Sequence, residues 1–175
     1  MTKNLRKFSS ALAVIAVLFT SLNAMAKDDA PKAETTSYKV RLDYRQSLVQ
    51  MVAAGRFGQV NDMITTDFRV HKRENGGKEI IIVHFNREMS LKEALAGLKS
   101  LGLRPAELPE LCALGAQEPE LQRSFPIVGL GSFYKDEYRN TYLPFLIWRG
   151  SERRLSLDIF KKGFSGNYRF AAVRK

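Results

Sequence analysis

The chain is poor in the residue types that most often carry chemistry. Its 175 residues include one cysteine, one tryptophan and two histidines. A single cysteine excludes an internal disulfide, so the hydrophobic core alone must hold an exported form of this chain together. Cys112 falls within an expected helix, where a small buried side chain is its usual role. No neighbouring base marks Cys112 as a nucleophile.

The two histidines, His71 and His84, do not form a metal-binding pattern. They lie on the two arms of a hairpin that we expect over residues 67–85, where their imidazoles could meet across the ladder. A zinc site in a protein needs three or four ligands, and no cysteine or carboxylate pattern supplies the missing ones. The sequence therefore predicts no metal ion and no cofactor.

Motifs of common enzymes are absent as well. The segment Gly129-Leu130-Gly131 lacks the helix and the lysine of a phosphate-binding loop. Ser132 follows an expected strand, where a nucleophile could lie, but no Gly-x-Ser-x-Gly elbow surrounds it. No two carboxylates are singled out by their spacing as an acid–base pair. We predict no catalytic residue, and an enzyme is the less favoured interpretation.

Only one long hydrophobic run is present, over residues 11–22. Lys3, Arg6 and Lys7 precede it and Ala24-Met25-Ala26 follows it, a pattern typical of a signal peptide that is cut after Ala26. Twelve helical residues span about 18 Å, less than the roughly 30 Å of a bilayer core, which disfavours an uncleaved anchor. We expect export to the periplasm or the cell exterior, with no transmembrane span after cleavage.

Acidic residues are in deficit. The chain has 28 Lys and Arg against 18 Asp and Glu, a formal net charge of +10. The excess lies mainly in residues 135–175, which hold ten cations and four acids. A basic exported surface favours an anionic envelope polymer, a glycan or nucleic acid as partner. The alternative is a solvated face that only keeps the protein soluble.

The rest of the chain is organised as one domain. Residues 27–37 are polar and include Pro31, which predicts a flexible leader. A single globular domain is expected over 38–175, with 38–78 as an N-terminal strand–helix–strand extension and 79–175 as the core. The 149 residues left after cleavage are enough for a domain with its own hydrophobic core.

Periodicity predicts the elements of the extension. Apolar and charged residues alternate over 38–44, which predicts a strand, and helical spacing predicts a helix over 45–54. The hairpin over 67–85 has Asn75-Gly76-Gly77 as its turn. Its second arm is apolar on both faces over 80–83, which predicts a central strand.

Two helices are expected in the core. A capping box, Ser90 with Glu93, starts the first, over 90–99. The second, over 108–114, follows the extended dipeptide Arg104-Pro105. Further strands are predicted over 125–131, 142–148, 154–160 and 168–173. The sequence thus predicts an α+β fold in which two short helices pack on a mostly antiparallel sheet.

Three segments resemble a family of small bacterial proteins to which no activity is assigned. They have the patterns RPA…EL.ALG, LQR.FPIV.LGS and YRF.AVRK, and lie at residues 104–115, 121–132 and 168–175. The resemblance covers roughly residues 80–175. It implies a common fold and no function.

The order of the expected elements also resembles C-type-lectin-like domains. In the formylglycine-generating-enzyme branch of that fold, an Arg-Leu-Pro-Thr segment opens the second helix, much as Arg104-Pro105 does here, and the last strand ends in Val-Arg, as Val173-Arg174 does. The calcium motifs and the paired active-site cysteines of these proteins are absent. The resemblance implies a non-calcium, non-catalytic domain in which strand 80–85 pairs with strand 168–173.

Aromatic and cationic residues alternate over residues 133–154. Such a surface suits flat sugars, bases and anionic polymers. The alternative is that Trp148 belongs to the core and the arginines are only solvated. The predicted ligand-binding residues are Tyr134, Tyr138, Arg139, Trp148, Arg149, Arg153 and Arg154.

Three functions remain open from the sequence. The favoured one is an exported non-catalytic binding module for an anionic or carbohydrate-type ligand of the envelope or exterior. The second is a small secreted hydrolase, for which Ser132 and His84 would have to lie within reach of each other. The third is a structural or assembly partner.

Overall fold

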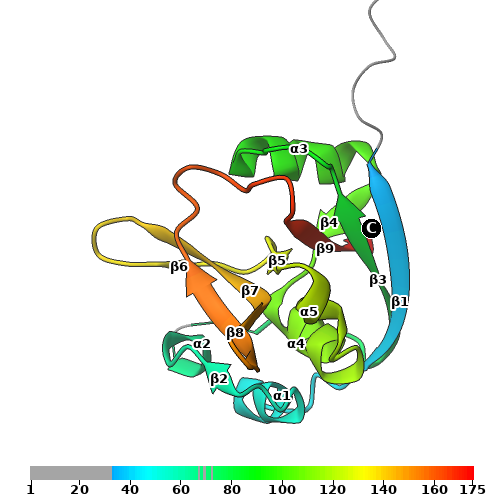
Figure 1. The fold of residues 1–175 in the computed structure, drawn as a ribbon. Coiled ribbons are helices and arrows are strands. Elements are labelled where there is room, and N and C mark those ends of the chain that lie inside the picture. The colour runs from blue at the N-terminus through cyan, green and yellow to red at the C-terminus, as the bar shows by residue number, and fades with distance from the viewer. Residues whose placement is uncertain (1–32, 67, 69, 72) are drawn as a thin grey trace, which may run out of the picture. The chain divides into compact units, whose positions relative to one another are not determined.

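The computed structural model describes residues 33–66, 68, 70, 71 and 73–175. They form a single domain of short helices on a mostly antiparallel sheet (Figure 1), which confirms the predicted α+β class. The predicted signal peptide, residues 1–26, and the first part of the leader, residues 27–32, lie outside the described residues. Among the helices that are described, none is long and apolar enough to cross a bilayer.

Nine strands make up the sheet, in the order β1-β3-β9-β5-β7-β8-β2, with β4 beside β9 and β6 beside β7. The pairs β5–β9 and β2–β8 are parallel, and the other described pairs are antiparallel. The strands are β1 (Glu34–Leu42), β2 (Gln59–Val60), β3 (Gly76–His84), β4 (Leu103–Pro105), β5 (Ile127–Gly129), β6 (Tyr134–Lys135), β7 (Thr141–Arg149), β8 (Glu152–Asp158) and β9 (Arg169–Arg174).

Strands β3 and β9 are interior strands of the sheet, each with a neighbour on both sides. They pair antiparallel, with Ile80 opposite Val173 and Val83 opposite Phe170. Residues 80–83 are buried on both faces, because helices or loops cover each side of the sheet. The expected pairing of 80–85 with 168–173 is therefore confirmed, as is the central position of the apolar run.

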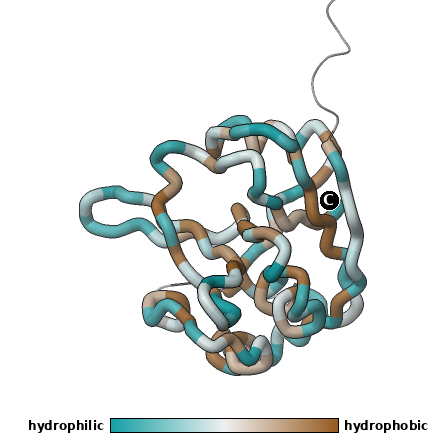
Figure 2. The backbone as a smooth tube through the Cα atoms, viewed as in Figure 1, coloured by the Kyte–Doolittle hydropathy of each residue, from teal (hydrophilic) through white to brown (hydrophobic). Residues whose placement is uncertain are grey.

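Helices pack on both faces of this sheet. Ala94 and Leu98 of α3 join the cluster on one face, and Leu111 and Leu114 of α4 join the cluster on the other. The helices are α1 (Leu48–Ala54), α2 (Met63–Thr66), α3 (Leu91–Ser100), α4 (Leu108–Gln117) and α5 (Leu121–Ser124). Figure 2 shows hydrophobic residues along the inner strands and a hydrophilic loop between β6 and β7.

The predicted start of α3 is confirmed. The Ser90 hydroxyl accepts a hydrogen bond from the N–H of Glu93 at 3.2 Å, and the Glu93 carboxylate accepts from the N–H of Ser90 at 2.9 Å. The second predicted helix is also present and runs on to Gln117. Gly115 lies inside this helix. A glycine is needed there because a Cβ would come within 2.8 Å of the Phe57 ring.

The predicted hairpin over residues 67–85 is wrong. Strand β3 pairs with β1 over its whole length, and Gly76 and Gly77 lie within β3, opposite Leu42 and Arg41. The Asn75 side chain does not make a hairpin turn but accepts a hydrogen bond from the N–H of Tyr44 at 2.6 Å. The ladder across which the two histidines could have met therefore does not form.

The predicted leader also differs from the structure at its end. Glu34–Ser37 belong to β1 and pair with Ile81–His84. The periodicity missed them because β1 is an edge strand whose first four residues are exposed, so they need no apolar alternation. The first helix starts later than expected, at Leu48, after a capping box of Ser47 and Gln50.

Candidate functional site

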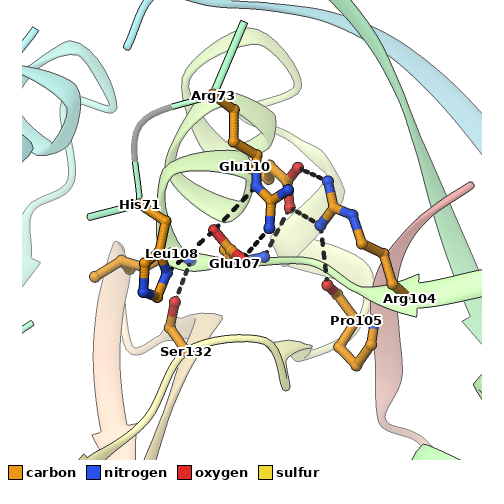
Figure 3. Close-up of polar contacts among 8 residues, drawn as sticks. All are labelled: His71, Arg73, Arg104, Pro105, Glu107, Leu108, Glu110 and Ser132. Carbon is orange, nitrogen blue, oxygen red and sulfur yellow. Dashed lines mark hydrogen bonds and ion pairs between the residues drawn. The ribbon is translucent and has the colours of Figure 1, made fainter. Parts of the chain in front are cut away.

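The start of α4 is surrounded by a cluster of charged side chains (Figure 3). Glu110 is fully buried, and its two carboxylate oxygens accept hydrogen bonds from the guanidinium of Arg104 at 2.5 and 2.9 Å. The same carboxylate accepts the N–H of Glu107 at 2.8 Å. The extended segment Arg104-Pro105, predicted from sequence, thus places a guanidinium beside Glu110, and this ion pair offsets the cost of burying the carboxylate.

Ser132, 24 residues further along the chain, caps the N-terminus of α4. Its hydroxyl accepts a hydrogen bond from the N–H of Leu108 at 2.8 Å. The chain approaches closely there because the N–H of Gly131 donates to the carbonyl of Ala106, and a Cβ at Gly131 would lie 2.7 Å from that oxygen. With Pro109 lacking an N–H, the first N–H groups of α4 are already satisfied, so the helix end is not an anion site.

A second ion pair lies beside the first. The guanidinium of Arg73 donates to the carboxylate of Glu107 at 2.5 Å, and Nδ1 of His71 lies 3.9 Å from the same carboxylate. Each of the two acids therefore has its own arginine. The cluster carries little net charge, and within the described residues no group of three or more His, Cys, Asp or Glu could hold a metal ion.

Tyr44 is buried next to the cluster. Burial and the carboxylates of Glu110 and Glu107 raise the pKa of its phenol to about 12. The hydroxyl has no hydrogen-bond partner among the described residues. The phenol therefore stays protonated at physiological pH, and it offers a donor rather than a base.

A hollow of about 280 Å³ opens beside this cluster. It is lined by the aromatic side chains that follow Ser132, by Lys135 and by His71. Phe133 is 57% exposed and His71 is 76% exposed on its side chain. The hollow thus joins a hydroxyl, an imidazole, an ammonium and aromatic faces, and we call it the Ser132 hollow.

The structure divides the seven predicted ligand-binding residues. Tyr134 lines the Ser132 hollow, and Tyr138 and Arg139 lie exposed on the loop between β6 and β7. The other four lie at the far ends of β7 and β8, roughly 27 Å away along a nine-residue strand. The predicted residues therefore do not form one continuous surface.

Arg153 is a structural residue. Its guanidinium donates to the carbonyls of Gly55, at 2.8 Å, and Gly115, and to the side chain of Gln122 at 3.3 Å. It also stacks 5.0 Å from the centre of the Phe57 ring. These contacts join β8 to the ends of α1 and α4, and they engage three of the five N–H groups of the guanidinium.

Trp148 and the two remaining arginines differ from one another. The indole of Trp148 is half-buried under the guanidinium of Arg123, 3.7 Å from its centre. Arg154 is paired with Glu152 at 2.8 Å, whereas Arg149 is exposed at the end of β7. Neighbours along a strand point to opposite faces, so the side chains of Arg153 and Arg154 leave β8 on different sides.

The remaining nucleophile and base candidates are also placed. Cys112 is buried, which raises the pKa of its thiol to about 12, so it is not a thiolate at neutral pH. His84 is held at the end of β3, with Nε2 2.8 Å from the carbonyl of Gly166 and Nδ1 3.3 Å from Glu34. His84 does not line the Ser132 hollow, so the expected pairing of Ser132 with His84 is not made.

Comparison with protein-family models, with curated proteins and with solved structures found no match to this chain. The resemblances to the small bacterial family and to C-type-lectin-like domains therefore stay predictions.

Proposed function

We propose that this protein is an exported binding module for a carbohydrate-type or anionic polymer, and that it binds through residues 132–139, which we call the binding arm. The observation that carries the proposal is the exposure of two aromatic rings on this short segment: Phe133 is 57% exposed and Tyr138 is 78% exposed. Packing an exposed aromatic ring against a ligand removes the ring from water and stabilises the complex. Two such rings on one short segment therefore favour a binding role.

The arm is held in shape before any ligand binds. The Asp136 carboxylate accepts hydrogen bonds from the N–H of Asn140 at 2.7 Å and from its side chain at 2.8 Å. Arg139 takes a positive φ of 62° in the same turn and donates its N–H to the carbonyl of Asp136. A preorganised loop loses less entropy on binding, which supports a recognition role.

Charge on the arm itself is balanced, with Lys135 and Arg139 against Asp136 and Glu137. The aromatic rings therefore supply the local recognition, and they are suited to stacking against the flat faces of sugar rings. Cleavage after Ala26 would remove Lys3, Arg6 and Lys7 and leave a net charge of +7 out of the +10. This charge acts at longer range and raises the rate of encounter with anionic polymers.

The proposal is tested by affinity electrophoresis of the purified protein in gels that contain a neutral β-glucan, heparin or single-stranded DNA. Phe133→Ala combined with Tyr138→Ala should weaken retention at least about tenfold, the loss of about 1.4 kcal/mol of binding free energy. Val49→Ala is the matched control, because Val49 is 58% exposed on α1, outside the arm.

Retention that is equal for the double variant and the control would remove the arm from the proposal. Retention by heparin and DNA alone, lost with rising salt, would reduce the binding to long-range charge. Retention by glucan that persists in high salt and needs both rings would support sugar stacking.

A second candidate function, a serine hydrolase, is favoured by one observation. Ser132 and His71 line the same hollow, and Glu107 lies 3.9 Å from His71. A serine, an imidazole and an acid are the three components of a hydrolytic triad. The salt bridge of Glu107 to Arg73 weakens its hold on the imidazole, so we rank this candidate second.

Hydrolysis of p-nitrophenyl acetate by the purified protein tests the second candidate. A catalytic Ser132 and His71 predict that His71→Gln and Ser132→Ala each lower the rate at least about a hundredfold. The free energy of unfolding of Ser132→Ala measures the loss of the cap at the start of α4 separately from the loss of a nucleophile. A rate equal to that of buffer for the unmodified protein excludes the hydrolase.

A further inference from the structure

A second hollow, of about 750 Å³, opens on the other side of α4, between the end of β1, the start of β3 and the two helices α1 and α4. We call it the β1–α4 pocket. Part of its wall is apolar and is contributed by β1, α1 and α4. The apolar lining residues are Leu42, Met51, Ala54, Pro109, Ala113 and Ala116.

Most of the polar groups around this pocket are already engaged. The Gln117 amide donates to the carbonyl of Arg41 and accepts its N–H, both at 2.9 Å, in the manner of a neighbouring strand. The Asp43 carboxylate is bound by the guanidinium of Arg45 at 2.8 Å, which lowers the pKa of that carboxyl to about 2. These two side chains therefore contribute no net charge.

The guanidinium of Arg41 is different. It lines the pocket, and among the described residues it forms no hydrogen bond and no ion pair. It is exposed at the end of β1. One cation without an ion-pair partner thus lines a pocket that also has an apolar wall.

Two glycines leave space on the strand side of the pocket. Gly76 has a φ of 135° and Gly77 lies opposite Arg41 in the ladder, and a Cβ added at either would meet nothing within 4 Å. The positive φ accounts for glycine at position 76, whereas neither φ nor crowding accounts for glycine at position 77. Without a side chain at these two positions, a ligand can approach the strand backbone closely.

We propose that the β1–α4 pocket binds a small amphipathic anion, with an aromatic or branched aliphatic group against the apolar wall and a carboxylate or sulfonate at Arg41. Its volume lies within the roughly 300–1,000 Å³ of small-molecule sites, and its lining combines the apolar residues with polar side chains and two glycines. A guanidinium binds a carboxylate or sulfonate through two parallel N–H groups. This site is separate from the binding arm and does not depend on the proposed function.

The test is a titration of the purified full chain, ¹³C-labelled at its methionine methyl groups, with 2-naphthalenesulfonate. The Met51 methyl signal, assigned with Met51→Leu, should shift and saturate. Arg41→Ala should weaken binding about tenfold. The cation 2-naphthylmethylammonium, which has the same ring system, should bind at least tenfold more weakly than the sulfonate.

Matched variants decide the outcome. Ala116→Phe should fill the pocket and abolish the shift of Met51, and Ala113→Leu serves the same purpose if the first variant melts at a lower temperature than the parent. Arg149→Ala, an exposed cation outside the pocket, should leave the affinity unchanged. Equal weakening by Arg41→Ala and Arg149→Ala, or a Met51 shift that survives a filled pocket, would overturn the proposal. The Phe133 and Tyr138 variants should bind naphthalenesulfonate as the parent does.

Discussion

Individual arginines of the C-terminal part have opposite roles although the sequence presents them as one group. Arg153 bonds two carbonyls and a side-chain amide and covers the Phe57 ring, and burial lowers its pKa. Arg153→Met should therefore lower the free energy of unfolding by at least about 2 kcal/mol, because it leaves buried carbonyls without donors. Urea denaturation followed by circular dichroism measures the change.

Arg149→Met is the control for this substitution. Arg149 is exposed at the end of β7, so its loss should change stability by no more than about 0.5 kcal/mol. If both variants unfold at the same urea concentration, Arg153 is a surface cation and regains its place among the ligand-binding candidates.

At the scale of a single element, α3 depends on the ionised form of Glu93. The N–H and hydroxyl of Ser90 and the guanidinium of Arg87 lower the pKa of this carboxyl from 4.5 to about 2. A carboxyl with a lower pKa in the folded state stabilises the fold above its unfolded pKa. The contribution should therefore be complete above about pH 5 and disappear as the pH falls from 4.5 towards 2.

Unfolding of Glu93→Gln measures this effect. Glutamine keeps the shape of the capping box but does not titrate, so the stability difference between the parent and this variant should shrink as the pH falls through that window. A difference that is constant from pH 6 to pH 2 would show that the ionisation of Glu93 does not contribute. Taking the difference cancels the similar titration of Asp43, whose pKa is also lowered to about 2.

At the scale of the whole domain, its last strand joins the two halves of the sheet. Strand β9 lies between β3 on one side and β4 and β5 on the other. A chain that ends at Tyr168 would leave β1 and β3 without a connection to β5, β7 and β8. We expect such a chain to lack cooperative urea unfolding and near-ultraviolet circular dichroism.

A chain that ends at Arg174 is the matched control, because it lacks only the exposed Lys175. It should unfold cooperatively, close to the parent. Cooperative unfolding of the chain that ends at Tyr168 would mean that the β7–β8 side and its helices fold without β9, which the arrangement of the sheet does not support.

The candidate site was predicted only in part. The sequence pointed to the segment beyond Ser132, and Tyr134, Tyr138 and Arg139 do lie on the binding arm. Phe133 belonged to the aromatic and cationic segment but not to the predicted ligand-binding residues, because a sequence does not show whether a ring is exposed or buried. The sequence also showed no sign of the β1–α4 pocket, because the lining of that pocket comes from segments up to 76 residues apart, from Arg41 to Gln117.

The sequence alone determined the features that depend on near neighbours. The capping box of Ser90 and Glu93, the extended Arg104-Pro105 and the doubly buried run over 80–83 follow from contacts within a few residues or from local hydrophobicity. Short-range geometry leaves these segments few alternatives.

The tertiary structure decided which distant segments meet. Strand β3 pairs with β1 and β9, Ser132 caps a helix that begins 24 residues earlier, and Arg153 joins β8 to α1 and α4. Each of these outcomes depends on competition among segments for the same strand edge, helix end or carbonyl. That competition is settled by packing of the whole domain, so no local pattern in the chain records it.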